Sequence, residues 1–313
     1  MKPEVPAEPA APFPPAHGRL CVALAALLWS TSGAFTKVLT LPTPLGLHEP
    51  TITALQIACG RSLFGALVLL PALRRRDLSF RPLMAVMVLS FVLMNATFVS
   101  AQALGTAANA IVLQYTGPLW MYLASVWLLG ERADRRNLTA LGIGLAGVAV
   151  IVGGGWQAGE LATVGVGLAS GVGYAGVLIC LRVLSGASSR WLTVLNLLAG
   201  GLMLVPFVWS LALPAPGQLA VLFVYGAAQM ALPYWLVARG LRGVSPQEAG
   251  IITLLELPLN PVWAYLVSGE RPRWFTFAGG AFILGALAWR YAPRPRPRRP
   301  GPGRDAPRRA SAT

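Results

Sequence analysis

The sequence predicts an all-α integral membrane protein whose ten transmembrane helices form two inverted five-helix repeats. Composition is the first observation behind this prediction. The 313-residue chain is 55% hydrophobic and 12% charged, and its mean hydropathy is +0.62. A soluble chain carries about 25% charged residues. The deficit of charge indicates that most of the surface of this protein faces something other than water.

Ten apolar runs are the second observation, because a helix needs about 20 residues to cross the hydrocarbon core of a bilayer. Short connectors containing Pro, Gly or Arg separate the runs. We expect spans at residues 18–38, 51–72, 83–103, 107–128, 138–154, 162–182, 191–211, 218–237, 248–267 and 274–290. The predicted organisation is a disordered tail (1–17), a first repeat (18–154), a second repeat (162–290) and a disordered Pro/Arg-rich tail (291–313).

Basic residues are unevenly distributed between alternate connectors. If the N-terminus is cytoplasmic, the outside loops contain just Lys37, Arg271 and Arg273 of the 25 Lys and Arg residues. The positive-inside rule then places both termini in the cytoplasm and the protein in the cell (inner) membrane. This distribution accounts for the net charge of +14 without a nucleic-acid-binding groove. Lys37 is expected to be solvated at the outer end of its helix.

An internal repeat is the third observation. Residues 113–132 are LQYTGPLWMYLASVWLLGER, and residues 254–271 are LLELPLNPVWAYLVSGER. Both stretches contain proline within the span, and both end in Gly-Glu-Arg. Five helices per repeat is an odd number, so the second repeat crosses the membrane in the opposite direction to the first. Inverted repeats of this kind permit alternating access, which indicates a transport protein.

Two charged residues lie within predicted spans. A charge at the centre of a bilayer costs about 2.5–3.5 kcal/mol on insertion scales. Glu256 is therefore expected to bind a cationic group or take up a proton, although a structural carboxylate capped by a hydroxyl or amide is the alternative. Arg61 could bind a substrate carboxylate. The interpretation we favour for Arg61 is structural, with the guanidinium paired to carbonyl groups at helix ends or to Glu256.

Prolines and polar residues within the spans complete the candidate site. Pro118, Pro258 and Pro261 remove backbone donors, and the freed carbonyl groups can face a cavity; ordinary kinked helices are the alternative. Each polar side chain within a span is more often part of a helix–helix hydrogen bond. As a set, however, they could line a cavity. The candidates are Trp29, Gln114, Tyr115, Gln229, Glu256 and Asn260.

Neither a cofactor nor a metal is expected. Cys21, Cys59 and Cys180 lie in apolar runs and are predicted to be small packing residues. The sequence holds two histidines, which argues against a histidine-based metal site. The glycines at 153–155 are not followed by the Lys-Ser/Thr pair of a phosphate-binding loop. ATP is therefore not expected to be the direct energy source.

Four motifs resemble those of EamA-type members of the drug/metabolite transporter superfamily. They lie at residues 28–37 in the first helix, 59–63 around Arg61, 107–132 in the fourth helix and 256–271 in the ninth. Residues 163–181 depart from the pattern, because they lack a clear Trp…Lys motif. The resemblance implies a ten-helix secondary transporter. Helices one to four and six to nine would enclose a cavity, with helices five and ten at the periphery.

The function predicted from these observations is secondary active transport of small metabolites. The protein would be an amino-acid or metabolite exporter that works by alternating access, driven by a proton gradient or by exchange, and not an enzyme. Two alternatives stay open: a membrane-embedded enzyme acting on lipid, and a non-transporting scaffold or receptor. The expected partners are a small-molecule substrate and the lipid bilayer, with no nucleic acid. A homodimer is allowed but not required.

Overall fold

The computed structural model describes residues 14–128, 130 and 135–291, and every regular element in these ranges is helical. Short 3-10 turns follow α3, and a π-helical turn (Gly226–Ala231) joins α10 to α11. The α-helices are α1 (Pro15–Ser30), α2 (Ser32–Thr40), α3 (Ala54–Leu69), α4 (Leu83–Leu104), α5 (Ala107–Gln114), α6 (Gly117–Leu128), α7 (Arg135–Gln157), α8 (Leu161–Val183), α9 (Ser189–Val208), α10 (Pro216–Tyr225), α11 (Leu232–Gly240), α12 (Pro246–Thr253), α13 (Glu256–Ser268) and α14 (Trp274–Tyr291).

Eight helical segments are long and apolar enough to cross a membrane. They correspond to eight of the predicted spans, and the first of them begins at Pro15, slightly before its predicted start. At the two other predicted positions the structure has the broken helix α5–α6 and helix α14. The all-helical prediction is thus confirmed, with eight candidate spans in the described residues. Of the predicted disordered tails (1–17 and 291–313), residues 1–13 and 292–313 lie outside the described residues, while Pro15–His17 and Tyr291 are helical, contrary to the prediction.

The fourth and ninth predicted spans are interrupted rather than merely kinked. Helix α5 ends at Gln114 and α6 begins at Gly117, while α12 ends at Thr253 and α13 begins at Glu256. Pro118 and Pro258 fall in the first turns of α6 and α13, where backbone N–H groups have no intrahelical partner to lose. Pro261 lies inside α13. The prolines thus mark the sites at which a second helical segment starts.

The two Gly-Glu-Arg sequences share a backbone feature at their first residue. Gly130 has φ of 65° and Gly269 has φ of 69°, in the left-handed region that glycine adopts readily. Gly269 ends α13, and its N–H bonds to the carbonyl oxygen of Tyr265. Such a left-handed residue is a common helix terminator. Glu131 and Arg132 of the first copy lie outside the described residues.

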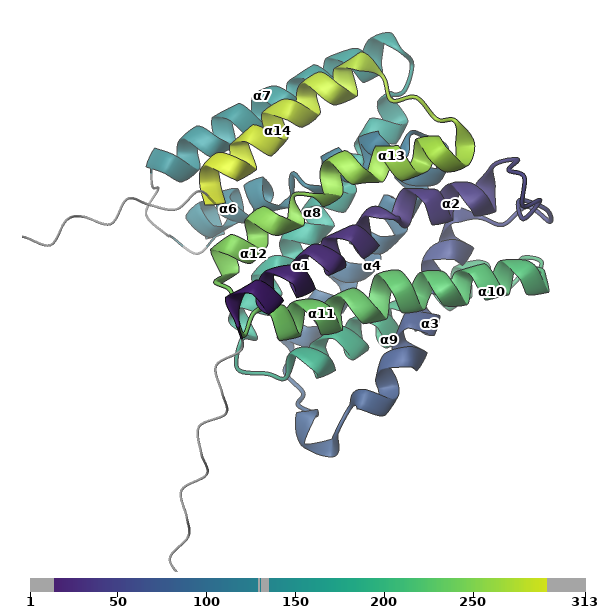
Figure 1. The fold of residues 1–313 in the computed structure, drawn as a ribbon, viewed down its shortest axis with the longest axis horizontal. Helices are drawn as coiled ribbons and strands as arrows, with labels where there is room; N and C mark the ends of the chain where they lie inside the picture. The colour runs from purple at the N-terminus through teal and green to yellow at the C-terminus, as the bar shows by residue number, and fades with distance from the viewer. Residues whose placement is uncertain (1–13, 129, 131–134, 292–313) are drawn as a thin grey trace, which may run out of the picture.

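The closest helix pairs join the first half of the chain to the second half. Helix α4 packs on α8, α3 on α9, α1 on α11, α2 on α13, and α7 on α14. Helices α7 and α14 lie side by side along one edge of the molecule (Figure 1). A Cβ atom on Gly147 would lie 2.6 Å from the carbonyl oxygen of Gly279, so these two backbones are nearly in contact. The edge position agrees with the peripheral place expected for the fifth and tenth spans.

Candidate substrate cavity

A cavity of about 390 Å³ lies between the two halves of the chain. Its walls come from α1, α3, α4, α5, α8, the π-helical turn, α11 and α12, together with residues at the two helix breaks. Six of the seven residues predicted for the site line this cavity: Trp29, Arg61, Gln114, Tyr115, Gln229 and Glu256. These residues are far apart in the sequence, and the packing of the first half against the second brings them together.

Glu256 connects the two helix breaks across the cavity. It is the first residue of α13 and is 8% exposed. Its Oε2 atom accepts a hydrogen bond of 2.6 Å from the hydroxyl of Tyr115, which follows α5. That hydroxyl also lies 3.0 Å from the carbonyl oxygen of Thr253, the last residue of α12. One carboxylate oxygen is therefore held by the protein, while Glu256 still contributes to the cavity wall.

Arg61 is held by neutral side chains. It is 2% exposed, and its Nε and one terminal nitrogen donate to Oδ1 of Asn95 at 2.9 and 2.5 Å. The other terminal nitrogen donates to the hydroxyl of Tyr225 at 2.9 Å and to Oε1 of Gln229 at 3.1 Å. The guanidinium carbon also lies 5.1 Å from the ring centroid of Tyr225, within the range of a cation–π interaction.

The predicted partners of Arg61 were wrong. Among the residues that the structure describes, no carboxylate lies within 4.0 Å of its guanidinium, and its hydrogen bonds go to side chains rather than to carbonyl groups at helix ends. Helix α4 and the π-helical turn supply the amide acceptors instead, and the last residue of α10 supplies the hydroxyl acceptor. Since no carboxylate among the described residues forms an ion pair with Arg61, its positive charge at the cavity wall could attract an anionic group.

The partners of Arg61 are themselves fixed by further hydrogen bonds. The Asn95 amide donates to the carbonyl oxygen of Ala58 and to the hydroxyl of Ser62, both at 3.0 Å. The Gln229 amide donates to the carbonyl oxygen of Trp29 at 3.1 Å. The π-helical turn, a feature common at functional sites, places Gln229 in this position. Tyr225 was not among the predicted residues, although a tyrosine hydroxyl within a span needs a polar partner.

Asn260 lies outside the cavity wall, contrary to the prediction. It is fully buried, and its amide donates to the hydroxyl of Ser32 at 2.9 Å. A Cβ atom on Gly33 would lie 2.7 Å from Oδ1 of Asn260. The small glycine lets α2 and α13 approach, so Asn260 points into the contact between these helices. Pro118, Pro258 and Pro261 are likewise not among the residues that line the cavity.

One end of the bundle carries a buried ion pair. Nζ of Lys37, at the end of α2, lies 2.7 Å from Oε2 of Glu270 and donates to the carbonyl oxygen of Gly105 at 2.7 Å. The other Glu270 oxygen accepts a 2.7 Å hydrogen bond from the N–H of Ala107, the first residue of α5. The two side chains are 4% and 10% exposed. The expectation that Lys37 is solvated was therefore wrong, because three chain segments meet around it.

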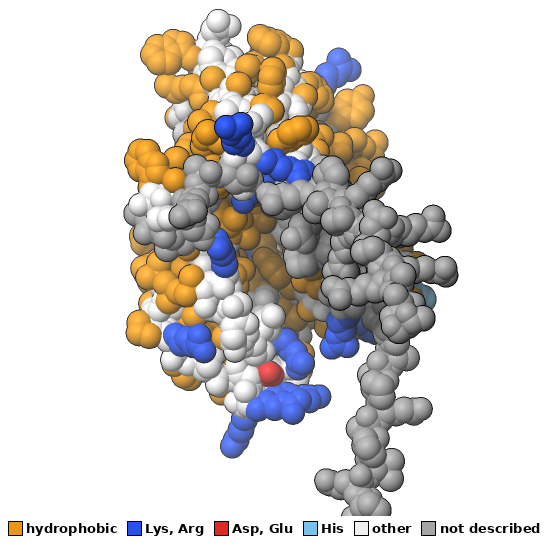
Figure 2. Space-filling model, turned by 90° about the vertical axis from the view of Figure 1, so that its left-hand side faces the viewer, with side chains coloured by type: hydrophobic (Ala, Val, Ile, Leu, Met, Phe, Trp, Pro, Cys, Tyr) orange, Lys and Arg blue, Asp and Glu red, His pale blue; other side chains and the backbone are white. Residues whose placement is uncertain are grey.

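The cavity extends toward the opposite end. There its lining includes Leu181 near the end of α8, Leu241 after α11, and Ala249 and Gly250 in α12. Figure 2 looks onto this end and shows blue Lys and Arg side chains around a recess with orange hydrophobic walls. Two ion pairs lie at this end in the described residues: Arg19 with Glu248 at 2.6 Å, 60% and 37% exposed, and Arg190 with Asp77 at 3.7 Å, 52% and 13% exposed. Neither of these pairs of described residues is buried on both sides as Lys37 and Glu270 are.

Comparisons with known proteins agree with this architecture. A model of the EamA-like transporter family matches residues 17–153 and 161–291. The chain is 29% identical over 280 residues to an uncharacterized transporter of Archaeoglobus fulgidus, covering 88% of this chain and 97% of that protein. It is 26% identical over 277 residues to the pseudopaline exporter CntI of Pseudomonas aeruginosa, covering 85% and 93%.

Two further comparisons extend this result. The chain is 29% identical over 296 residues to a riboflavin transporter of Rhizobium johnstonii, covering 86% of this chain and 89% of that protein. A protein of known crystal structure has the same fold, with a TM-score of 0.59 at 18% sequence identity. The superposition covers 88% of this chain and 96% of the other chain.

Proposed function

Because this chain belongs to the EamA-like transporter family, we propose that it is a secondary active exporter of small metabolites that works by alternating access. The observation that carries this proposal is the cavity between the two halves of the chain, with Arg61 and Glu256 in its wall. A transporter must bind its substrate at a site that both sides of the membrane can reach in turn. A cavity built from both halves meets this need, since relative movement of the halves changes which end is open.

The difference between the ends supports alternating access. The end at Lys37 and Glu270 is held shut by a buried ion pair, whereas the end at Leu241 and Gly250 contributes to the cavity lining. With ten spans in two inverted repeats (18–154 and 162–290) and both termini cytoplasmic, the cavity extends toward the cytoplasm. This is the conformation in which an exporter takes up its substrate.

The substrate class follows from the charges in the cavity wall. Arg61 has neutral partners and attracts an anionic group, while Glu256 attracts a cationic group or takes up a proton. Trp29, Tyr115 and Tyr234 add aromatic surface. A small molecule with a carboxylate and an amine, such as an amino acid or a related metabolite, complements this set. The names of the relatives, a pseudopaline exporter and a riboflavin transporter, indicate that substrates vary among similar proteins.

Counterflow in proteoliposomes tests the proposal. Vesicles are preloaded with unlabelled amino acids and related metabolites, labelled counterparts are added outside, and a pH gradient is imposed or omitted. Accumulation of one class identifies the substrate, and its response to the gradient separates proton coupling from exchange. Glu256→Gln should lose most of the flux, while Glu248→Gln, at the exposed ion pair, should keep it. Full flux with Glu256→Gln would refute the role of that carboxylate.

Absence of flux for every compound, with the protein shown to be folded and inserted, would count against the proposed exporter. The same result together with a stable partner complex would favour a scaffold or receptor.

A further inference from the structure

A second, smaller cavity of about 210 Å³ forms a groove between α9 and α11. Helix α9 packs on α3 and α4, while α11 packs on α1 and the π-helical turn, so α9 and α11 each pack mainly on other helices and the groove lies between them. It is lined by Leu69, Ala72, Ser189, Arg190, Thr193, Val194, Tyr234, Trp235, Ala238, Arg239 and Arg242. The proposed orientation places it at the cytoplasmic end, where α9 begins and α11 ends.

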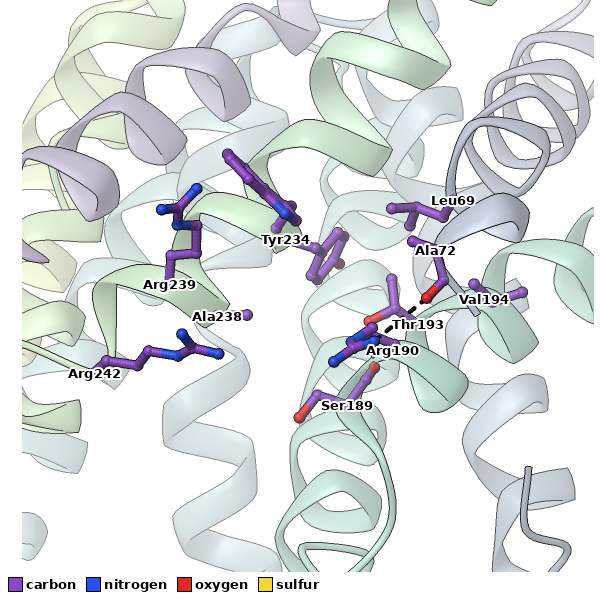
Figure 3. A pocket seen from close by; sticks show the side chains of 11 residues that line it. Leu69, Ala72, Ser189, Arg190, Thr193, Val194, Tyr234, Ala238, Arg239 and Arg242 are labelled. Atoms are coloured by element: carbon purple, nitrogen blue, oxygen red, sulfur yellow. Dashed lines mark hydrogen bonds between the residues drawn. The ribbon is translucent and has the colours of Figure 1, made fainter. Parts of the chain in front are cut away.

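Three arginines line this groove: Arg190 in α9, Arg239 in α11 and Arg242 just after α11. Figure 3 shows Arg190 on one side of the groove and Arg239 and Arg242 on the other, with the Arg242 side chain pointing into the gap. In the described part of the chain, no carboxylate lies within 4.0 Å of Arg239 or Arg242. Two positive charges of the groove are therefore not offset by an ion pair.

Arg190 is the one groove arginine with an acidic neighbour. A terminal nitrogen of Arg190 lies 3.7 Å from Oδ2 of Asp77. Asp77 also accepts a 2.9 Å hydrogen bond from the backbone N–H of Arg74, and this bond holds the pKa of Asp77 below its usual range. Asp77 is therefore ionised at neutral pH and is already engaged. The positive charges of Arg239 and Arg242 are therefore the ones that a ligand can neutralise.

The groove also has an apolar wall. Leu69, Val194 and Ala238 line it beside the arginines, and the Arg239 guanidinium carbon lies 4.7 Å from the ring centroid of Trp235. Trp235 is 47% exposed, and tryptophan is enriched where the bilayer meets water. Charged groups above an apolar wall at the end of a span match a lipid, whose phosphate lies at the interface and whose acyl chain runs along the helices.

We propose that this groove binds the headgroup of an anionic phospholipid. The phosphate lies beside Arg239 and Arg242, with the hydroxyl of Ser189 on the other side of the groove, and an acyl chain follows Leu69 and Val194. Tyr234 lines both this groove and the substrate cavity. A lipid bound in the groove therefore contacts Tyr234, which also lines the substrate cavity. Lipid-dependent transport follows from this contact and rests on the proposed function, whereas lipid binding does not.

The test is a titration of the purified full-length protein followed by native mass spectrometry and thermal unfolding. The probes are phosphatidylglycerol, phosphatidylcholine and inorganic phosphate. Phosphatidylglycerol should bind and raise the unfolding temperature more than the other two. Each arginine near a membrane surface adds about 1 kcal/mol, so Arg239→Gln/Arg242→Gln should weaken phosphatidylglycerol binding about 10- to 30-fold. Equal stabilisation by inorganic phosphate would overturn the lipid assignment.

Two further variants separate a defined site from general charge attraction. Arg75→Gln/Arg135→Gln removes two exposed arginines that do not line the groove, and it should keep wild-type binding. Ala238→Trp retains every charge but fills the groove, and it should reduce binding as strongly as the double arginine variant. Equal loss in the Arg75/Arg135 control, or unchanged binding in Ala238→Trp, would refute the site. If any variant fails to fold, the other two still decide the question.

Discussion

The Lys37–Glu270 pair and the Arg19–Glu248 pair lie at opposite ends of the molecule and differ in exposure. Lys37 and Glu270 are 4% and 10% exposed, whereas Arg19 and Glu248 are 60% and 37% exposed. Removing one partner of a buried pair leaves an unpaired charge and costs about 3–5 kcal/mol. An exposed pair contributes about 0–1 kcal/mol. The buried pair therefore stabilises the Lys37 end strongly, whereas the exposed Arg19–Glu248 pair adds little resistance to rearrangement at the opposite end.

Under the proposed alternating-access mechanism, this difference predicts where the barrier to conformational change lies. To open the end at Lys37, the protein must separate a buried pair and also release the N–H of Ala107 from Glu270. To close the opposite end, it needs to move exposed side chains and the ends of helices. Substrate binding between Arg61 and Glu256 would have to favour the rearrangement at Lys37. Four variants test this view.

Glu270→Gln should have the largest effect. It leaves Lys37 buried without a counter-charge, so the free energy of unfolding should fall by about 3–5 kcal/mol. Unfolding in a denaturing-detergent titration measures this change. The double variant Lys37→Met/Glu270→Leu is the control, because apolar side chains of similar size can replace a buried pair without loss. If the double variant is as unstable as Glu270→Gln, the buried, unpaired charge of Lys37 is not the reason for the loss of stability.

Arg61→Met should have the next largest effect, at the centre of the cavity. The substitution leaves acceptors on Asn95 and Gln229 without a donor, and a hydrogen bond to a charged group contributes about 1.5–3 kcal/mol. We expect a loss of that size in the free energy of unfolding and no counterflow. Arg61→Lys keeps the charge but loses the forked geometry of the guanidinium. Compared with Arg61→Met, it should regain more of the free energy of unfolding than of the counterflow flux. Equal recovery of both would contradict a geometric role for the guanidinium.

Tyr115→Phe should have a smaller effect, confined to the contact between the two helix breaks. It removes the hydroxyl that donates to Glu256, so flux should fall several-fold while the free energy of unfolding drops by about 1–2 kcal/mol. Counterflow and detergent titration measure the two quantities. Tyr265→Phe is the matched control, because Tyr265 is 49% exposed and does not line the cavity. Equal flux in both variants would argue against the Tyr115–Glu256 contact in transport.

Arg19→Gln should have the smallest effect. Its partner Glu248 is partly exposed, so the free energy of unfolding should change by less than about 1 kcal/mol. Added salt should reduce the difference from the wild type further, because salt screens exposed charges. Detergent titration at low and high salt measures this. A loss as large as that of Glu270→Gln would mean that both ends are held equally firmly.

The sequence itself determined the helical fold and the place of the two charged residues along it. Apolar runs of nearly membrane-spanning length can satisfy their backbone groups as helices, so α3, α4, α7, α8 and α9 follow from local composition. The prolines at 118 and 258 indicated disturbed helices in the fourth and ninth spans, whereas the breaks before α6 and α13 came from the structure. Glu256 and Arg61 were candidates because a charge in an apolar run is unfavourable without a partner or a function.

Packing between the two halves determined which groups meet. Arg61 is 164 residues from Tyr225 and 168 from Gln229, and nothing local to position 61 indicates these acceptors in place of Glu256. Asn260 faces Ser32 because Gly33 lets α2 and α13 approach, and Lys37 is buried because Glu270 folds back onto it. Helical periodicity predicts the face on which a side chain lies, whereas the partner on that face comes from a distant helix.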